Sequence, residues 1–243
     1  MTHALDGDHS HAPAAIRARL LAGASPGYLR DWIYGAIDGA VTTFAIVAGV
    51  IGADLSVGVI LVLGAANLLA DGFSMAAANY SGTRAEHEER RRLTAIERRH
   101  IRTNPEGERQ EIREIYRAKG FSGEDLERVV AVISADEGLW VEAMLVEEYG
   151  QSPVLRSPWA AGGVTFVAFL IAGLAPLAPF ALDLPFAERW AIGLTGAVFF
   201  LVGAVKSRWT LAHWAWAGAE TLLIGGTAAA VAFGVGRLFQ DVL

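Results

Sequence analysis

Two aspartates and a methionine lie inside the first two long apolar segments of the chain. Asp38 is in IYGAIDGAVTTFAIVAGVIGA, and Asp71 and Met75 are in LVLGAANLLADGFSMAAANY. An ionised carboxylate within a bilayer costs several kcal/mol, so acidic residues in such segments usually mark an ion pathway or a proton relay. We therefore interpret the chain as one that moves a cation across a membrane.

Three further pairs of potential metal ligands lie in a charged segment between apolar regions. Residues three or four positions apart share one face of a helix. Carboxylate and imidazole groups suit first-row transition metals, and a thioether adds a soft ligand. The spacing is compatible with a divalent metal site, but taken alone it is explained equally by solvated or Arg-paired glutamates and core-filling methionines. The pairs are Glu97 with His100, Glu108 with Glu111, and Met144 with Glu148.

The elements that position these residues are predicted to be helices in an all-α fold. Hydrophobic residues make up 53% of the 243 positions, and most charged residues fall between Arg84 and Arg156. A hydrocarbon core requires about 20 apolar residues per helix. Five segments qualify: 33–53, 55–79, 159–181, 189–205 and 213–236. The predicted organisation is a disordered cytoplasmic tail (1–30), transmembrane helices 1 and 2 (31–80), a cytoplasmic metal-binding insert (81–157), and transmembrane helices 3 to 5 (158–243).

The insert is predicted to contain three helices. The first continues the second span through 80–102 and ends at Asn104-Pro105, because proline disfavours a helical residue before it. The second covers 105–118 and stops at Lys119-Gly120. The third runs from Ser122 to 149, with a possible break at 136–138.

Basic residues predict the orientation. With a cytoplasmic N-terminus, every Lys and Arg except Arg189 and Arg237 lies on the cytoplasmic side, so the C-terminus is expected outside. The tail has no apolar signal-peptide core; its histidines (His3, His9 and His11) could bind metal loosely, although a solvated tail is the simpler interpretation. We expect a multi-pass protein of a bacterial inner membrane.

Composition excludes several classes of site. The chain has no cysteine, which removes disulfides, thiolate zinc sites and cysteine nucleophiles. Acidic and basic residues are interspersed in the insert, so no basic stripe suggests nucleic acid as a partner.

The acidic residues of the spans can form a pathway. Asn67, Asp71 and Met75 are spaced by four, which places them along one helix face. At about 1.5 Å per residue, Asp38 and Met75 lie roughly 9 and 7 Å from the cytoplasmic ends of their spans, so they can face each other. Glu220 in the fifth span is either a further pathway residue or a paired residue between helices.

The chain resembles the vacuolar iron transporter family of iron and manganese exporters. The resemblance covers Tyr34 to Gly236 and rests on DGAVTTFAIVAG, NLLADGFSMAAANY, PEGERQEIREIYRAKGF, SPW and LLIGGTAAA. It implies a homodimer with five transmembrane helices per chain and a three-helix cytoplasmic metal-binding domain between the second and third. It also implies proton-coupled antiport of Fe²⁺ or Mn²⁺ out of the cytoplasm, with no permanently bound cofactor; Co²⁺ and Zn²⁺ are further possible cargoes.

The resemblance assigns roles to individual residues. Asp38 and Met75 correspond to the pathway aspartate and methionine. His100 stands where the family has a further glutamate, Leu145 where some relatives have a second methionine, and Asn67 where some have a glutamate. The implied cytoplasmic ligands are Glu97, Glu108, Glu111, Met144 and Glu148.

Proton coupling and dimerisation each have a physical basis. A cation and protons compete for the same carboxylate oxygens, so metal binding expels protons and protonation releases metal. Gly35 and Gly39, with Gly49 and Gly52, would let two copies of the first helix approach closely, unless these glycines pack within one chain.

Two other functions fit parts of the sequence. Glu97 and His100 form one Glu-x-x-His unit of the kind that holds iron in di-iron helical bundles, so a membrane-anchored ferroxidase is conceivable. That site needs a second unit, which the sequence lacks. A metal sensor that does not transport would leave the acidic residues of the spans without a role.

Overall fold

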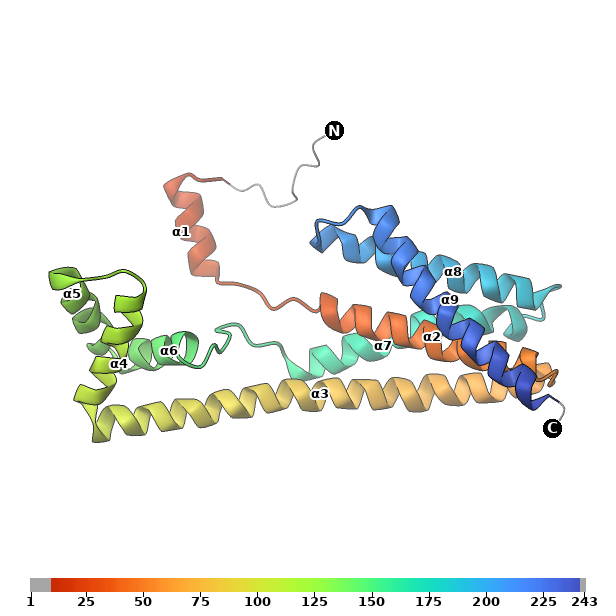
Figure 1. Cartoon of the computed structure of the whole chain (residues 1–243), viewed down its shortest axis with the longest axis horizontal. Coiled ribbons are helices and arrows are strands. Elements are labelled where there is room, and N and C mark those ends of the chain that lie inside the picture. Colours follow the sequence, from red (N-terminus) through yellow and green to blue (C-terminus); the bar gives the residue numbers. More distant parts are fainter. Residues whose placement is uncertain (1–9, 241–243) are drawn as a thin grey trace. The chain divides into compact units, whose positions relative to one another are not determined.

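Only helices make up the regular structure of residues 10–240, which are the residues that this computed structural model describes (Figure 1). The chain divides into two compact units. The bundle unit contains residues 28–92 and 156–240, and the insert unit contains residues 10–27 and 93–155. Helix α3 (Val57–Thr103) contributes residues to both. The predicted all-α class is confirmed.

Within residues 10–240, five helices are long and apolar enough to cross a membrane. They correspond to the five predicted segments, with ends shifted by a few residues. Many large apolar side chains on them are exposed, such as Phe73, Ile171 and Leu223, as expected where lipid is the solvent. In chain order the helices are α2 (Leu29–Gly52), α3, α7 (Pro158–Ala181), α8 (Ala187–Lys206) with the 3₁₀ turn η1 (Ser207–Trp209), and α9 (Trp214–Phe239).

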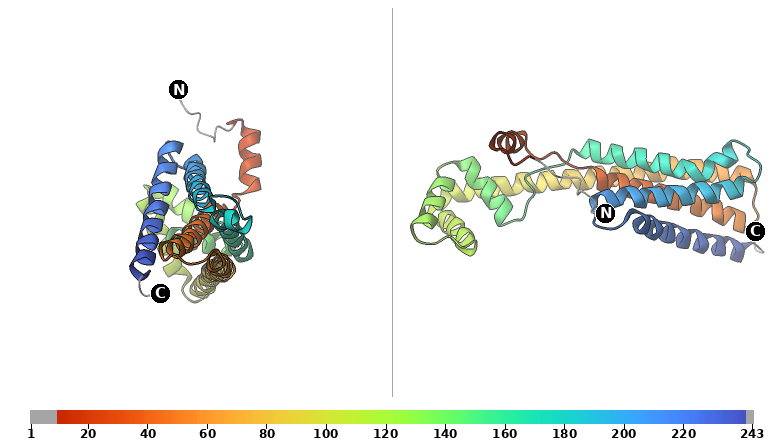
Figure 2. Two further views of the ribbon diagram at one scale, coloured as in Figure 1. Left: turned by 90° about the vertical axis from the view of Figure 1, so that its right-hand side faces the viewer. Right: turned by 90° about the horizontal axis from the view of Figure 1, so that it is seen from above.

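Helix α2 is the centre of the bundle unit, where it contacts α7, α8 and α9 (Figure 2). The approach to α7 is close because glycines remove the side chain at the crossing. A Cβ atom at Gly35 would lie 2.2 Å from the Thr165 carbonyl oxygen, and one at Gly39 would lie 2.3 Å from the Phe169 carbonyl oxygen. These separations are far below van der Waals contact, so only glycine fits.

The glycines of α2 therefore pack within the chain, which corrects the prediction that they mediate a dimer. Further along α2, a Cβ at Gly52 would lie 2.6 Å from the Phe233 carbonyl oxygen of α9, and one at Gly49 would lie 3.6 Å from that of Ala232. The spacing of small residues correctly predicted that α2 packs closely against another helix. The helices that it contacts are α7 and α9 of the same chain. The glycines thus provide no argument for a homodimer.

Three short helices of the insert unit enclose a core of their own. They are α4 (Pro105–Ala118), α5 (Gly123–Ser134) and α6 (Glu137–Glu147). Asn104 caps α4 by accepting a hydrogen bond from the Gly107 amide (3.2 Å), and Asp136 caps α6 by accepting one from the Leu139 amide (2.7 Å). Their buried apolar residues form one cluster: Ile112, Leu126, Val130, Ile133, Trp140 and Met144.

The helices of the insert differ from the prediction in one respect. Helix α3 continues without interruption to Thr103, as predicted. The single third helix expected from Ser122 to 149 is two helices, because Asp136 leaves the helical conformation and caps α6. The break falls at the beginning of the range that the sequence indicated.

Part of the N-terminal segment is helical, whereas the sequence predicts a disordered tail over residues 1–30. Helix α1 (Pro13–Ala22) begins with proline at its first position, is rich in alanine, and ends at Gly23 with a positive φ of 70°. Helix α2 already begins at Leu29. His3 and His9, suggested as loose metal ligands, lie outside the described residues.

We expect the α2–α7 crossing to be sensitive to a single added methyl group. Gly39→Ala should destabilise the folded chain by about 1–3 kcal/mol, because the new Cβ overlaps backbone that cannot move aside. Thermal unfolding in detergent, followed by circular dichroism, measures the change. Gly163→Ala on α7 is the control, since a Cβ there meets nothing within 4 Å; equal unfolding temperatures for the two variants would contradict the packing argument.

Candidate metal centre

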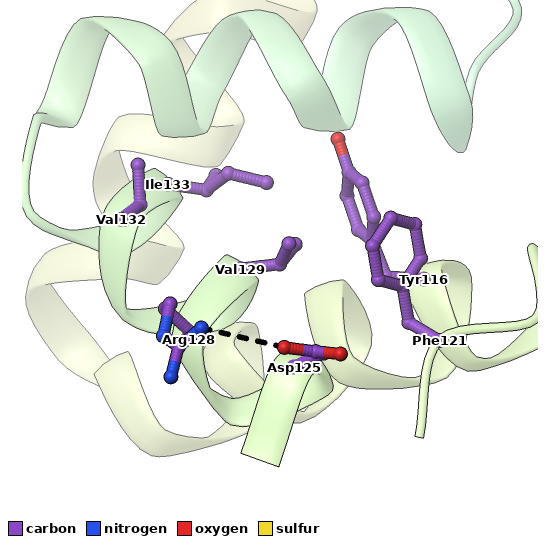
Figure 3. Close-up of a pocket in the computed structure, with 7 residues that line it drawn as sticks. All are labelled: Tyr116, Phe121, Asp125, Arg128, Val129, Val132 and Ile133. Atoms are coloured by element: carbon purple, nitrogen blue, oxygen red, sulfur yellow. Dashed lines mark hydrogen bonds and ion pairs between the residues drawn. The ribbon is translucent and has the colours of Figure 1, made fainter. Parts of the chain in front are cut away.

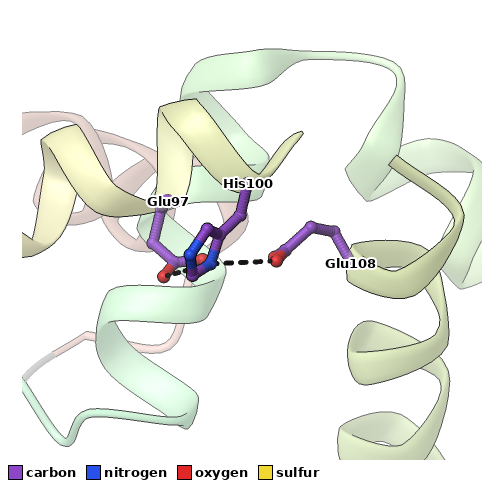
Figure 4. Close-up of side chains that lie close together, drawn as sticks. All are labelled: Glu97, His100 and Glu108. Atoms are coloured by element: carbon purple, nitrogen blue, oxygen red, sulfur yellow. Dashed lines mark ion pairs between the residues drawn. The ribbon is translucent and has the colours of Figure 1, made fainter. Parts of the chain in front are cut away.

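Glu97, His100 and Glu108 form a compact group of potential metal ligands in the insert unit (Figure 4). One ligand atom from each residue lies within 4.8 Å of the others. The His100 Nδ1 atom is 3.3 Å from Glu108 Oε1 and 3.8 Å from Glu97 Oε1. Two carboxylates and an imidazole thus converge on one point, which is a donor set suited to a first-row divalent ion.

The turn between α3 and α4 produces this convergence. Glu97 and His100 lie three residues apart near the end of α3, and Glu108 lies in the first turn of α4. The chain changes direction at Asn104, whose amide donates to the His100 carbonyl (2.8 Å) and whose carbonyl accepts from the Glu108 amide (3.2 Å). Pro105 fixes the first position of the new helix. The Asn104-Pro105 turn that ends α3 therefore also brings the side chains of α3 and α4 together.

Two carboxylate oxygens in this group have no partner. Glu97 and Glu108 are 1% and 4% exposed, and Oε2 of each is buried without a hydrogen bond from the described residues. Glu97 Oε1 accepts a hydrogen bond from the Tyr149 hydroxyl at 2.9 Å. A buried oxygen that keeps an unsatisfied lone pair is costly in free energy. A cation bound between Glu97 and Glu108 would remove this cost.

Negative charge accumulates around Glu108. Burial, followed by the neighbouring charges of Glu111 and Glu97, raises the pKa of the Glu108 carboxyl to about 8. The pKa of Glu148 is also raised, first by burial and then by Glu111 and Glu97. The charges of Glu97 and Glu111 thus oppose ionisation of Glu108 and Glu148, and a divalent cation would relieve that repulsion.

The other predicted ligands of the insert occupy different surroundings. Glu111 and Glu148 are exposed and act on the group through their charges. Met144 is completely buried in the apolar cluster of the insert, so it fills the core, and its role as a ligand stays a prediction. The sequence analysis missed Tyr149, although a hydroxyl next to the predicted ligand Glu148 was an available signal.

A second polar group follows the two facing helices of the bundle unit. We call it the α2/α3 seam: Asp38 and Thr42 on α2, and Asn67, Asp71 and Met75 on α3. The Asn67 amide donates to Thr42 Oγ1 at 3.1 Å, and Thr42 Oγ1 donates to the Asp38 carbonyl at 2.9 Å. Asp38 and Asp71 are close enough for their charges to interact. Four of the predicted pathway residues, Asp38, Asn67, Asp71 and Met75, are half-buried, and Asn67 serves as a donor between the helices.

Glu220 is part of an ion pair between helices. Its Oε2 atom lies 3.5 Å from Nζ of Lys206, the last residue of α8, and both side chains are partly exposed. This contact is the paired arrangement that the sequence analysis considered beside a pathway role. A pathway role for Glu220 stays a prediction.

A hollow elsewhere in the insert lacks metal-binding character. It lies against α4 and α5 and is lined mainly by Tyr116, Val129, Val132 and Ile133 (Figure 3). Its charged residues, Asp125 and Arg128, pair with each other at 3.4 Å. Among the described residues, the group around Glu97 is the one cluster of three or more acidic or histidine side chains that could hold a metal ion.

Comparison with known proteins points to one family. Residues 29–237 match the model of the VIT family. The chain is 34% identical over 239 residues to a vacuolar iron transporter of Toxoplasma gondii, covering 90% of this chain and 76% of that protein. It is 30% identical to vacuolar iron transporter 2 of Oryza sativa subsp. japonica, with 88% of each chain covered. Vacuolar iron transporter 1 of Arabidopsis thaliana is 28% identical, with 87% and 86% covered.

We expect metal binding at this centre to depend on pH. Because the pKa of Glu108 is about 8, a cation must displace a proton from it below that pH, so affinity for Mn²⁺ or Co²⁺ should rise from pH 6 to 8 and level off above about 8. Calorimetry in buffers of different ionisation enthalpy measures both affinity and proton release. Affinity that does not change with pH would refute the assignment.

Glu108→Gln should stabilise the metal-free chain near neutral pH. The folded chain keeps the Glu108 proton up to about pH 8, whereas the unfolded chain releases it near the ordinary value of 4.5. The carboxyl therefore weakens the folded state increasingly as pH rises from about 4.5 to 8, and the neutral amide does not. Unfolding temperatures of wild type and variant should agree at pH 4.5 and diverge by pH 8. Exposed Glu114→Gln is the control and should not show this divergence.

Proposed function

The chain belongs to the VIT family, and from this premise we propose that it exports divalent transition-metal ions, Fe²⁺ and also Mn²⁺, from the cytoplasm in exchange for protons. Family membership makes it a multi-pass membrane transporter and not an enzyme. The relatives named above are iron transporters by name, which supports iron as cargo. The membrane, the direction of transport and the coupling ion are parts of the proposal.

The observation that carries the proposal is the pair of unsatisfied carboxylate oxygens on Glu97 and Glu108. A soluble domain gains nothing in stability from burying Oε2 of both residues without a donor. The arrangement is useful when a cation supplies the missing charge. Since His100 and Glu108 are in contact at 3.3 Å, one ion can replace the interactions among all three side chains. We assign the capture of the cargo ion to this centre.

The α2/α3 seam provides the next positions for the ion. Asp38 and Asp71 lie within membrane-spanning helices, and their carboxylates accept no hydrogen bond from the described residues. A carboxylate at low dielectric is favoured when it holds either a cation or a proton. Metal that arrives therefore displaces a proton, and a proton that arrives from the other side releases the metal. Met75 adds a soft ligand that Fe²⁺ accepts and Mg²⁺ or Ca²⁺ does not.

The orientation and assembly that we propose follow the sequence. The concentration of Lys and Arg in the insert supports a cytoplasmic position for the insert and the N-terminus. A bacterial inner membrane remains our expectation for the location. A homodimer through the first membrane helix remains an implication of the family resemblance, without support from Gly35, Gly39 and Gly52, which pack within the chain.

A ferroxidase is disfavoured as the alternative. Its di-iron site would need two Glu-x-x-His units, whereas the metal-binding group found among residues 10–240 contains one histidine. A metal sensor would bind ions at the insert and show no flux. A transport measurement separates these functions from export.

Purified full-length protein in liposomes should move Fe²⁺ when a pH gradient is imposed, with a matching movement of protons. Asp38→Ala should abolish the flux because the carboxylate that holds the ion is lost, and Met75→Ala should reduce it strongly. Stopped-flow fluorescence with an internal metal dye and a pH dye measures both. Asp125→Asn, which removes an exposed carboxylate of the insert, is the control and should transport normally.

Glu97→Gln combined with Glu108→Gln should weaken metal capture and lower flux at subsaturating metal while the five spans stay folded. Flux that ignores the pH gradient would exclude proton coupling. Oxygen-dependent production of Fe³⁺ without flux would favour the ferroxidase.

A further inference from the structure

A buried cluster of polar side chains joins three segments at the end of the bundle unit where α2 begins. Asp31 is 1% exposed. Its Oδ1 atom accepts hydrogen bonds from Arg156 Nη1 at 2.6 Å and from Asn79 Nδ2 at 2.8 Å. Asn79 also donates to Thr165 Oγ1 on α7 at 2.7 Å. The cluster plays no part in the function proposed so far.

The cluster lies on the same helix faces as the α2/α3 seam. Asp31 and Asp38 are seven residues apart, which is two turns and about 10 Å along α2, so they point in nearly the same direction. Asn79 is one turn from Met75 on α3. The hydrogen bond from Asn79 to Asp31 joins α2 and α3 at one end of the seam, and the hydrogen bond from Asn67 to Thr42 joins them at the other. Asp38, Asp71 and Met75 lie between these two hydrogen bonds.

Arg156 has a second acceptor within reach. While Nη1 binds Asp31, Nη2 lies 3.5 Å from Oε1 of Glu86, whose side chain is 54% exposed. The Arg156 carbonyl is held 2.8 Å from a ring nitrogen of His87, so the backbone is fixed while the guanidinium can change partner. Asp31 Oδ2 is buried without a hydrogen bond. A buried ion pair with an unsatisfied oxygen is poor evidence for a purely stabilising role.

We propose that Asp31, Asn79 and Arg156 form a latch across the α2/α3 seam, and that this latch opens when Arg156 moves from Asp31 to Glu86. In the closed arrangement the guanidinium charge and the Asn79 bridge keep a cation from Asp38. Opening frees the Asp31 carboxylate to receive the ion. The latch residues act on transport through the access they give to the seam, so they are positioning residues. The inference rests on the proposed transport function.

The lack of cysteine in the chain allows a direct test of access. In full-length Met75→Cys protein in detergent, the rate of reaction with a charged methanethiosulfonate reagent reports how often the seam is open. Glu86→Gln removes the open-state partner of Arg156 and should slow the reaction by about fivefold or more. Asp31→Asn with Arg156→Gln removes both charges of the closed pair and should accelerate it by a similar factor. No transported ion is needed, so a chain without flux would still report on the latch.

The controls separate a latch from general loosening of the bundle. Arg84→Gln breaks an exposed ion pair with Glu88 on the same helix (2.9 Å) and should leave the rate unchanged. Because Glu86 is at the surface, Glu86→Gln tests the inference even if the double variant fails to fold. Unchanged or faster reaction in Glu86→Gln would overturn the latch. Normal metal capture and flux in a Glu86→Gln protein that retains Met75 would then leave the proposed function standing.

Discussion

The structure depends on buried carboxylates that each keep one oxygen without a hydrogen-bond donor from the described residues. Glu97 and Glu108 each bury an oxygen atom without a partner, and Asp31 does the same in the bundle unit. Folding normally avoids such groups, because an unpaired buried charge costs more than a hydrogen bond returns. Under the proposed function, this cost at Glu97 and Glu108 would be offset when a cargo ion binds there.

Helix α2 combines close packing against α7 with acidic side chains that need polar partners. It packs against α7 so closely that Gly35 and Gly39 contact backbone carbonyls, and it also carries Asp31 and Asp38. Asp31 is four residues from Gly35 and shares the face that packs on α7, where the Thr165 hydroxyl donates to its backbone carbonyl, whereas Asp38 is turned away from that face. The glycine contact fixes the rotation of α2. That rotation keeps Asp38 opposite the polar side chains of α3.

The membrane helices and part of the candidate metal centre could be predicted from the sequence, because both depend on residues that are close together in the chain. Long apolar runs gave the five membrane helices, and Asn104-Pro105 gave the end of α3. Spacing also identified Glu97 and His100 as neighbours. Spacing shows which residues share a helix face, but it does not show which element that face packs against. Gly35 and Gly39 pack on α7, and Met144 lies in the core of the insert unit. Tyr149 and Arg156 were missed because their partners, Glu97 and Asp31, are distant in sequence and only the fold brings them together.

The repulsion around Glu108 has a consequence for the lifetime of the protein in a cell. Without metal, the charge of Glu111 opposes ionisation of both Glu108 and Glu148, and a bound cargo ion at the proposed centre would relieve this repulsion. Ligands that bind only the folded state protect it from opening and hence from proteases. Cargo supply would then govern turnover, with starved cells degrading the protein sooner than replete cells. Pulse-chase decay rates that are equal in the two conditions would rule this out.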